Sequence, residues 1–159
     1  MFKNTLRALA LLAVTATAAQ AQTATQTVTF AVNAINQIAF TGAPSLTIIT
    51  AVAGSAPTSV TDATSTWAVT TNQTGAKITA SIAAAMPTGL TLSASLAAPA
   101  GATSAGFVAL STTAVDVVTV ITKLAQGSLG VSYRLAATAA AGVVASDTRL
   151  VTYTITGGT

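Results

Sequence analysis

The side chains that could carry catalysis are few, and their types limit the chemistry. The chain has three Asp residues, Asp62, Asp116 and Asp147, and no Glu, His or Cys. Carboxylate acid–base catalysis needs two such groups held together with pKa values that differ. These three lie 54 and 31 positions apart. We expect Asp62 and Asp147 to bond backbone amides in turns, and Asp116 to be a cap or a surface residue.

The residues that a nucleophilic mechanism needs are equally scarce. Without His, a serine nucleophile lacks its usual base. A Ser–Lys pair would have to use Lys77 or Lys123, but Lys77 opens an alternating segment and Lys123 follows an apolar run, so both are expected to face solvent. The Gly-containing stretches 99–106 and 127–130 lack the lysine and spacing of a phosphate-binding loop. We expect no catalytic residues and no enzymatic activity.

The same inventory argues against metals, cofactors and nucleic acid. His and Cys are the commonest zinc, copper and iron ligands, and the three acids are too sparse for a calcium loop. Four scattered cations, Lys77, Lys123, Arg134 and Arg149, form no cluster that could neutralise a run of phosphates. We expect no metal site and no cofactor-binding residue.

Two further residues have a functional and a structural interpretation. Trp67 is the only tryptophan, and it shares a strand face with Val69, which favours the core over a sugar-binding platform. Asn72-Gln73-Thr74 matches a glycosylation acceptor, but in a chain this rich in Thr chance explains the match better. It supports an exposed turn at that place.

The beginning of the chain predicts export. Lys3 and Arg7 precede the short apolar run 8–16, and Ala19-Gln20-Ala21 supplies small residues for cleavage. The apolar run is shorter than the roughly 20 residues that a membrane-spanning helix needs. We therefore expect residues 1–21 to be a signal peptide, residues 22–159 to be one domain, and no transmembrane segment in the mature chain.

The mature chain carries unusually few charges. Residues 22–159 contain the four cations and three Asp residues, giving a net charge of +1, whereas about a quarter of residues are charged in typical soluble domains. Thr, Ser, Asn, Gln and Ala must cover the surface instead, so little repulsion keeps copies apart. This composition favours a protein that packs against copies of itself or against a matrix.

Apolar residues alternate with Thr or Ser along most of the mature chain, which is typical of strands with one buried face. The clearest alternation is Thr27–Val32, with Val28, Phe30 and Val32 on one face. The remaining predicted strands are 35–40, 46–50, 66–71, 77–82, 90–96, 107–110, 129–136 and 150–156. Segments rich in Gly, Pro and Asn separate them, and short strands at this spacing predict an all-β fold, a single antiparallel β-sandwich.

Two stretches are ambiguous between strand and helix. Residues 112–125 could start a helix, but the β-branched run from Val117 to Thr122 favours a strand followed by a short helix. Residues 136–145 are Ala-rich, which suits a helix, but Gly142-Val143-Val144 interrupts them. We expect a strand end and a connecting loop there.

The arrangement resembles bacterial secreted immunoglobulin-like β-sandwiches, including pilins that polymerise by strand donation. The alternation 25–33 directly follows the cleavage site, where the donor strand of such a pilin lies. Ser132-Tyr133, Ala141-Gly142 and 150–155 resemble the last two strands of these modules, although the Cys pair of many pilins is missing. The resemblance implies an immunoglobulin-like fold in a fimbria-like subunit.

These observations lead to one functional hypothesis and one rival. We expect a secreted, non-enzymatic structural subunit of a cell-surface or extracellular assembly. It would associate with copies of itself through an edge or donor strand bearing Val28, Phe30 and Val32, with an export or assembly factor as a further partner. The alternative is a monomeric secreted binding module for a polysaccharide or an envelope component.

The signal peptide can be tested directly. Exported protein should begin at Gln22, because Ala19-Gln20-Ala21 fits the small-residue requirement of the cleavage site. Intact-mass measurement of protein recovered outside the cytoplasm checks this. Recovery of the chain with Met1 retained would contradict the export argument.

Overall fold

The computed structural model describes residues 20–159, so nearly all of the expected signal peptide lies outside the described residues. The chain divides into two units between Val32 and Asn33, and we call the larger one, Asn33–Thr159, the body. We call residues 22–32 the tail. The cleavage after Ala21 and the division at residue 22 stay predictions.

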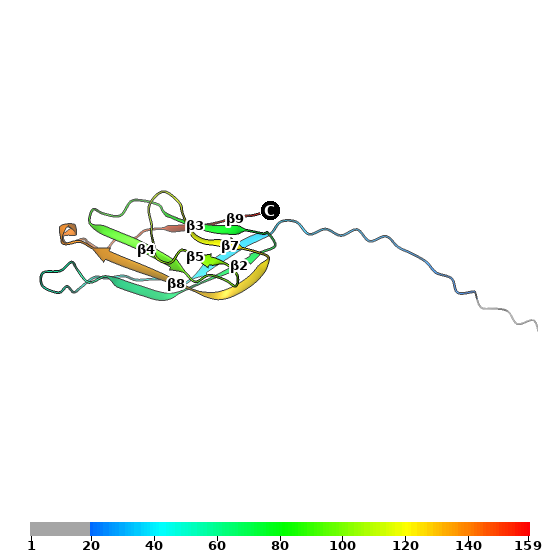
Figure 1. Cartoon of the computed structure of the whole chain (residues 1–159), viewed down its shortest axis with the longest axis horizontal. Helices are drawn as coiled ribbons and strands as arrows, with labels where there is room; N and C mark the ends of the chain where they lie inside the picture. Colours follow the sequence, from blue (N-terminus) through cyan, green and yellow to red (C-terminus); the bar gives the residue numbers. More distant parts are fainter. Residues whose placement is uncertain (1–19) are drawn as a thin grey trace, which may run out of the picture. The chain divides into compact units, whose positions relative to one another are not determined.

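The body is all-β and consists of two antiparallel sheets (Figure 1). The five-stranded sheet has the order β1 (Asn36–Thr41), β2 (Val60–Thr71), β8 (Leu124–Ala137), β4 (Leu90–Leu96) and β6 (Val108–Ala109). The four-stranded sheet has the order β5 (Thr103–Ser104), β7 (Val115–Ile121), β3 (Ala76–Ile82) and β9 (Val151–Thr156). Within residues 20–159 the one helical element is the short 3₁₀ turn η1 (Ala139–Ala141).

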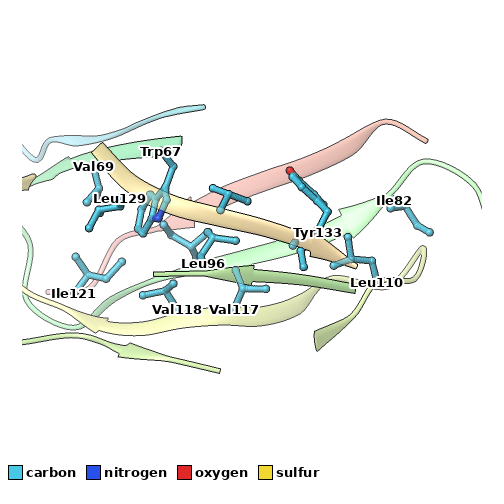
Figure 2. Close-up of a cluster of buried hydrophobic side chains, with 14 of the residues drawn as sticks. Trp67, Val69, Ile82, Leu96, Leu110, Val117, Val118, Ile121, Leu129 and Tyr133 are labelled. Atoms are coloured by element: carbon cyan, nitrogen blue, oxygen red, sulfur yellow. The ribbon is translucent and has the colours of Figure 1, made fainter. Parts of the chain in front are cut away.

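Alternating side chains explain why the strands bury one face. In β3, every second residue from Ala76 to Ile82 is buried, while Lys77, Thr79 and Ser81 are partly exposed. β-Branched Ile and Thr suit this half-buried, pleated position. The buried sides of both sheets meet in one core, and Figure 2 shows Trp67 and Val117 entering it from opposite sheets.

Trp67 is the largest side chain in this core, and only 1% of it is exposed. Its indole Nε1 donates a hydrogen bond to the Ala97 carbonyl at 3.2 Å. Val69, two residues along β2, is also buried. The prediction that Trp67 and Val69 share a core face is therefore confirmed, and Trp67 is not a surface platform for sugars.

Most of the predicted strands are present. The segments expected at 35–40, 66–71, 77–82, 90–96, 107–110, 129–136 and 150–156 correspond to β1, β2, β3, β4, β6, β8 and β9. The β-branched run within 112–125 forms β7, as expected. The Ala-rich stretch after Ala136 is the end of β8 followed by η1 and a loop, which agrees with a strand end plus connection.

Three expectations about secondary structure were wrong. Residues 27–32 belong to no strand, although their alternation is the cleanest in the chain. Residues 46–50 also lie outside the ladders, with a single bridge between Ala51 and Pro57 nearby. Finally, no short helix follows β7, because β8 begins at Leu124. A strand needs a hydrogen-bonding partner as well as an alternating face, and sequence periodicity reports only the face.

None of the helices in residues 20–159 is long and apolar enough to cross a membrane.

The tyrosine pair offers a test of the core. Tyr133 and Tyr153 are the only tyrosines, and the Tyr153 hydroxyl donates to the Tyr133 hydroxyl at 2.9 Å. Burial raises the pKa of both phenols, and the hydrogen bond to Tyr133 raises the pKa of Tyr153 further.

We expect neither tyrosine to ionise near pH 10 in the folded protein. Because the unfolded chain loses these protons near pH 10 and the fold retains them, the free energy of unfolding should be undiminished below pH 10 and fall above it. Phenolate ultraviolet absorbance measured against pH, in native buffer and in denaturant, checks both statements. Two tyrosines titrating normally in the native protein would contradict the buried pair.

Candidate functional site

The tail exposes the face on which the predicted self-association site lies. Val28, Phe30 and Val32 are 73%, 89% and 80% exposed, and the tail forms no strand. These are among the largest apolar exposures in residues 20–159. Single exposed apolar side chains are ordinary on proteins, and these three are notable because they alternate along one short segment.

Most other large exposed apolar side chains occur on two segments of the body. One segment, 44–57, follows β1, and the other, 142–150, precedes β9. Their exposed apolar residues are Ile49, Val52, Val143, Val144 and Leu150. The described chain therefore carries its uncovered apolar surface mainly in two places, the tail and these two segments.

Between the two segments lies a groove of about 680 Å³. One wall is formed by residues 46–51 and the other by residues 142–149, with Met86, Leu90 and Leu135 among the residues between them. Leu46 and Ile48 are half-buried, whereas Thr47 and Ile49 are exposed. Residues 46–49 therefore keep the alternation of a strand and direct one face inward, although they have no ladder.

Gly42 explains why the chain leaves the sheet at this point. The β1–β2 ladder ends at the pair Thr41–Thr66, and Gly42 follows with φ = 119°, a conformation that favours glycine. A Cβ on Gly42 would lie 2.6 Å from Ser65 Oγ and 2.8 Å from Ser65 Cα. Glycine thus allows the turn and the close approach, after which the chain leaves the ladder and residues 46–51 line the groove.

Two edge strands of the body, β1 and β9, lie next to each other. β1 pairs only with β2, and β9 pairs only with β3, so each has one unpaired side in its sheet. No ladder among the described residues joins β1 to β9, but Phe40 and Tyr153 stack with their ring centroids 4.0 Å apart. Ile38 and Ile155 are also only half-buried. We call the boundary between β1 and β9 the seam.

The charged side chains near the groove are paired with each other. Arg149 forms an ion pair with Asp147 and donates two hydrogen bonds to the Ala85 carbonyl at 3.2 and 3.1 Å. The Arg149 side chain and the Thr148 amide bond the Asp147 carboxylate and hold its pKa below the usual value. The groove therefore presents apolar walls beside a charge pair that is already satisfied.

The other candidate residues for chemistry have local structural partners. Asp62 accepts hydrogen bonds from the Thr64 hydroxyl, the Thr64 amide and the Ser45 amide at 2.7, 2.9 and 3.1 Å, which lowers its pKa. It does so at an irregularity in β2 rather than in the expected turn. Asp116 is a surface residue of β7 that pairs with Lys77 of β3 at 3.0 Å.

The described part of the chain contains no group of three or more His, Cys, Asp or Glu residues able to hold a metal ion. Each Asp is engaged by neighbouring amides, hydroxyls or a cation, and none is paired with a second carboxylate among the described hydrogen bonds. The arrangement offers binding surfaces, and no constellation for acid–base or nucleophilic chemistry.

Comparison with known proteins gives no relative. No protein family matches the chain, and neither a curated protein nor a solved structure is significantly similar to it.

Sequence reasoning found the tail but missed the groove. Both groove segments carry a pair of adjacent large apolar residues, Ile48-Ile49 and Val143-Val144. In a strand with one buried face, adjacent residues point to opposite sides. Two adjacent apolar residues therefore signal that one of them remains uncovered, and this signal was available in the sequence.

The groove can be tested with an apolar fluorescent dye. Ile48→Asn should weaken dye binding by roughly fivefold, the ratio given by about 1 kcal/mol of lost apolar contact. Val52→Asn is the matched control, since Val52 is exposed but does not line the groove. Fluorescence titration of the mature chain at high dilution measures both. Equal effects of the two substitutions would contradict a specific groove.

Proposed function

We propose that this protein is a secreted, non-enzymatic structural subunit of a cell-surface or extracellular assembly. Copies associate when the tail of one chain pairs with the body of another and places Val28, Phe30 and Val32 in its apolar groove. The observation that carries this proposal is the distribution of uncovered apolar side chains, which gather on the tail and around the groove.

Apolar burial supports the proposal in magnitude. Burying a Val or Phe side chain contributes about 1.5–3 kcal/mol, so three contribute roughly 5–9 kcal/mol. Bringing two chains together costs an estimated 4–15 kcal/mol in lost freedom. The side chains alone are therefore marginal, and the backbone hydrogen bonds of an added strand must supply part of the binding free energy.

The backbone of the tail and that of the body edges suit this pairing. Residues 22–32 contain no charge and no Pro, and neither do β1 and β9. Natural proteins commonly protect edge strands with Lys, Pro or bulges, because an uncharged edge pairs readily with another chain. A net charge of +1 over residues 22–159 adds little repulsion between copies.

Two sheets with an open seam are compatible with an immunoglobulin-like sandwich of the strand-donating kind, which we propose as the finer description of the fold. In that description β1 and β9 border the position of the added strand. The export signal would place the assembly outside the cytoplasm, through the periplasm in a Gram-negative host, and an export or assembly factor would be a transient partner.

The groove itself favours a second candidate function. A volume of about 680 Å³ lies in the range of small-molecule sites, so a monomeric secreted module could bind a polysaccharide segment or an envelope component there. This function requires that purified protein stays monomeric and that the tail is dispensable for binding.

A charge introduced at one tail residue distinguishes these two functions. Phe30→Asp should abolish self-association of the mature chain, because an aspartate cannot be buried unpaired in an apolar groove. Thr29→Asp is the matched control, since it adds the same charge to the opposite face of the same segment. Light scattering and negative-stain imaging over a concentration series measure the assemblies.

Removal of the tail gives the complementary result. A chain lacking residues 22–32 should fail to assemble, and a synthetic peptide of residues 22–33 should bind it and quench dye binding in the groove. The same peptide with Phe30→Asp is the control. Wild-type protein that remains monomeric at high concentration would contradict the structural-subunit proposal and favour the binding module.

A further inference from the structure

A tail that bears an apolar strand face can cover its own body as well as a neighbour. Folding back onto β1 is the shortest such route, because the tail directly precedes this strand. A tail sequestered in its own chain would not be available to another copy. The choice between the two routes therefore decides whether the protein assembles or caps itself.

The register of a folded-back tail follows from the sequence. Directly opposed residues of antiparallel strands point to the same face, and in β1 the inward residues include Ile38 and Phe40. Pairing Phe30 with Ile38 and Val28 with Phe40 would place the apolar tail residues on this inward face. The connecting loop is then Asn33-Ala34-Ile35, and three-residue loops are common in hairpins.

Asn72 holds these loop residues in another conformation. Its side-chain Oδ1 accepts a hydrogen bond from the Ile35 amide at 2.8 Å, and its Nδ2 donates to the Asn33 carbonyl at 2.7 Å. Its backbone amide donates to the Ile35 carbonyl at 3.3 Å. Asn72 follows the end of β2 directly, and Asn36 pairs with Thr71 at the start of the ladder, so these bonds extend the β1–β2 pairing to residue 33.

With residues 33–35 held in this way, a reversal must occur before Asn33. A two-residue turn at Ala31-Val32 would set Phe30 opposite Asn33 and Val28 opposite Ile35. Val32 would then lie in the turn, and neither Val28 nor Phe30 would reach Ile38 or Phe40. Val28, Phe30 and Val32 would then leave the seam uncovered.

The groove is also distant along the chain from the same tail. Val28 lies five residues from Asn33, or roughly 17 Å along an extended chain. Thr41 lies eight residues from Asn33 in the other direction, roughly 26 Å along β1, and Leu46 at the groove is further along the chain. Along the chain, the groove segment thus lies further from Asn33 than the apolar face of the tail does.

We propose that Asn72 is a positioning residue that prevents self-capping and so directs the tail to a second copy of the chain. This inference rests on the proposed function, because it presupposes that copies accept each other's tails. Ile35 acts in the same direction. The last residue of a three-residue hairpin loop commonly adopts a left-handed conformation, which a β-branched side chain disfavours.

The glycosylation match at Asn72 is explained by the same contacts. A glycan would be attached to Nδ2, the atom that donates to the Asn33 carbonyl. A carboxamide engaged on both sides by backbone is poorly placed to act as an acceptor, and its role in the fold accounts for the residue.

The experiment uses the absence of Cys from the chain. In the self-capped register Thr29 opposes Ala39 on the outward face, so Thr29→Cys and Ala39→Cys form a reporter pair within disulfide distance. Isotopically heavy and light mature chains are mixed, unfolded, refolded together and oxidised. Mass spectrometry of the cross-linked peptides then separates bonds within one chain, which are purely heavy or purely light, from bonds between chains.

The release variant combines Asn72→Ala with Ile35→Gly in the reporter chain. We expect the ratio of within-chain to between-chain disulfides to rise by at least about fivefold, the factor that one lost hydrogen bond of average net strength gives. Assemblies seen by light scattering should shorten in parallel. Asn72→Asp retains an acceptor for the Ile35 amide but loses the donor to Asn33, so it should give a smaller rise without removing the side chain.

Gln126→Ala is the matched control, because the Gln126 Oε1 accepts a hydrogen bond from the Ala100 amide at 2.8 Å far along the sequence from the tail. It removes a similar side chain-to-backbone bond and should leave the disulfide ratio unchanged. Thermal unfolding of each variant shows whether it is folded. If Asn72 had only a structural role, Asn72→Ala and Gln126→Ala would affect thermal unfolding alike, and neither would change the disulfide ratio.

The outcomes are distinguishable. Assembly of the parent reporter chain with an unchanged disulfide ratio in every Asn72 variant overturns the positioning role and leaves the proposed function standing. A parent chain that does not assemble overturns the proposed function and this inference with it. Predominantly within-chain disulfides in an assembling parent chain overturn the inference, because self-capping would then occur with Asn72 in place.

Discussion

The long antiparallel pair β2–β8 is the constraint on which the rest of the body depends. These are the longest strands, at 12 and 14 residues, and every other strand of their sheet pairs with one of them or with β4. They also supply Trp67, Val69, Leu129, Val131 and Tyr133 to the core. With no disulfide and few charges, backbone pairing and apolar packing are the means left to hold the sheets together.

The groove follows from where the ladder between β1 and β2 ends. β2 pairs with β1 only up to Thr66, and Gly42 then turns the chain away beside Ser65. Leu46 and Ile48 consequently face inward without a ladder, whereas residues 142–148 before β9 are exposed. The groove is therefore a product of where strand pairing stops.

The sequence predicted the strands in which apolar and polar residues alternate clearly. It missed features that depend on pairing between segments far apart in the chain. Lys77–Ile82 and Leu90–Leu96 alternate clearly and form β3 and β4. The start of β2, from Val60 to Ser65, contains Asp62, Ala63 and Ser65, which have little β-propensity or mark turns. It is a strand because β8 pairs with it. Conversely, residues 27–32 have the best alternation and no partner, so periodicity alone overstated their structure.

The candidate site shows the same division. Val28, Phe30 and Val32 could be singled out because a face is a local property that three residues at a spacing of two define. The Asn72 contacts could not, since they join residues 37 or more positions apart that sequence spacing does not relate. For the groove, the sequence signals the two uncovered apolar pairs but not that their segments line one groove.

A chain that exposes a strand face with nothing to pair with carries a standing risk of uncontrolled aggregation. Charges or Pro would remove the risk and the function together, because either would prevent the strand from being accepted. The alternative is to fix where the strand can go. We propose that a carboxamide that ties residues 33–35 to the end of β2 limits the tail to partners beyond its own seam, while the groove offers one place that fits an apolar face. Specificity then comes from the position of the tail, and affinity from the strand it adds.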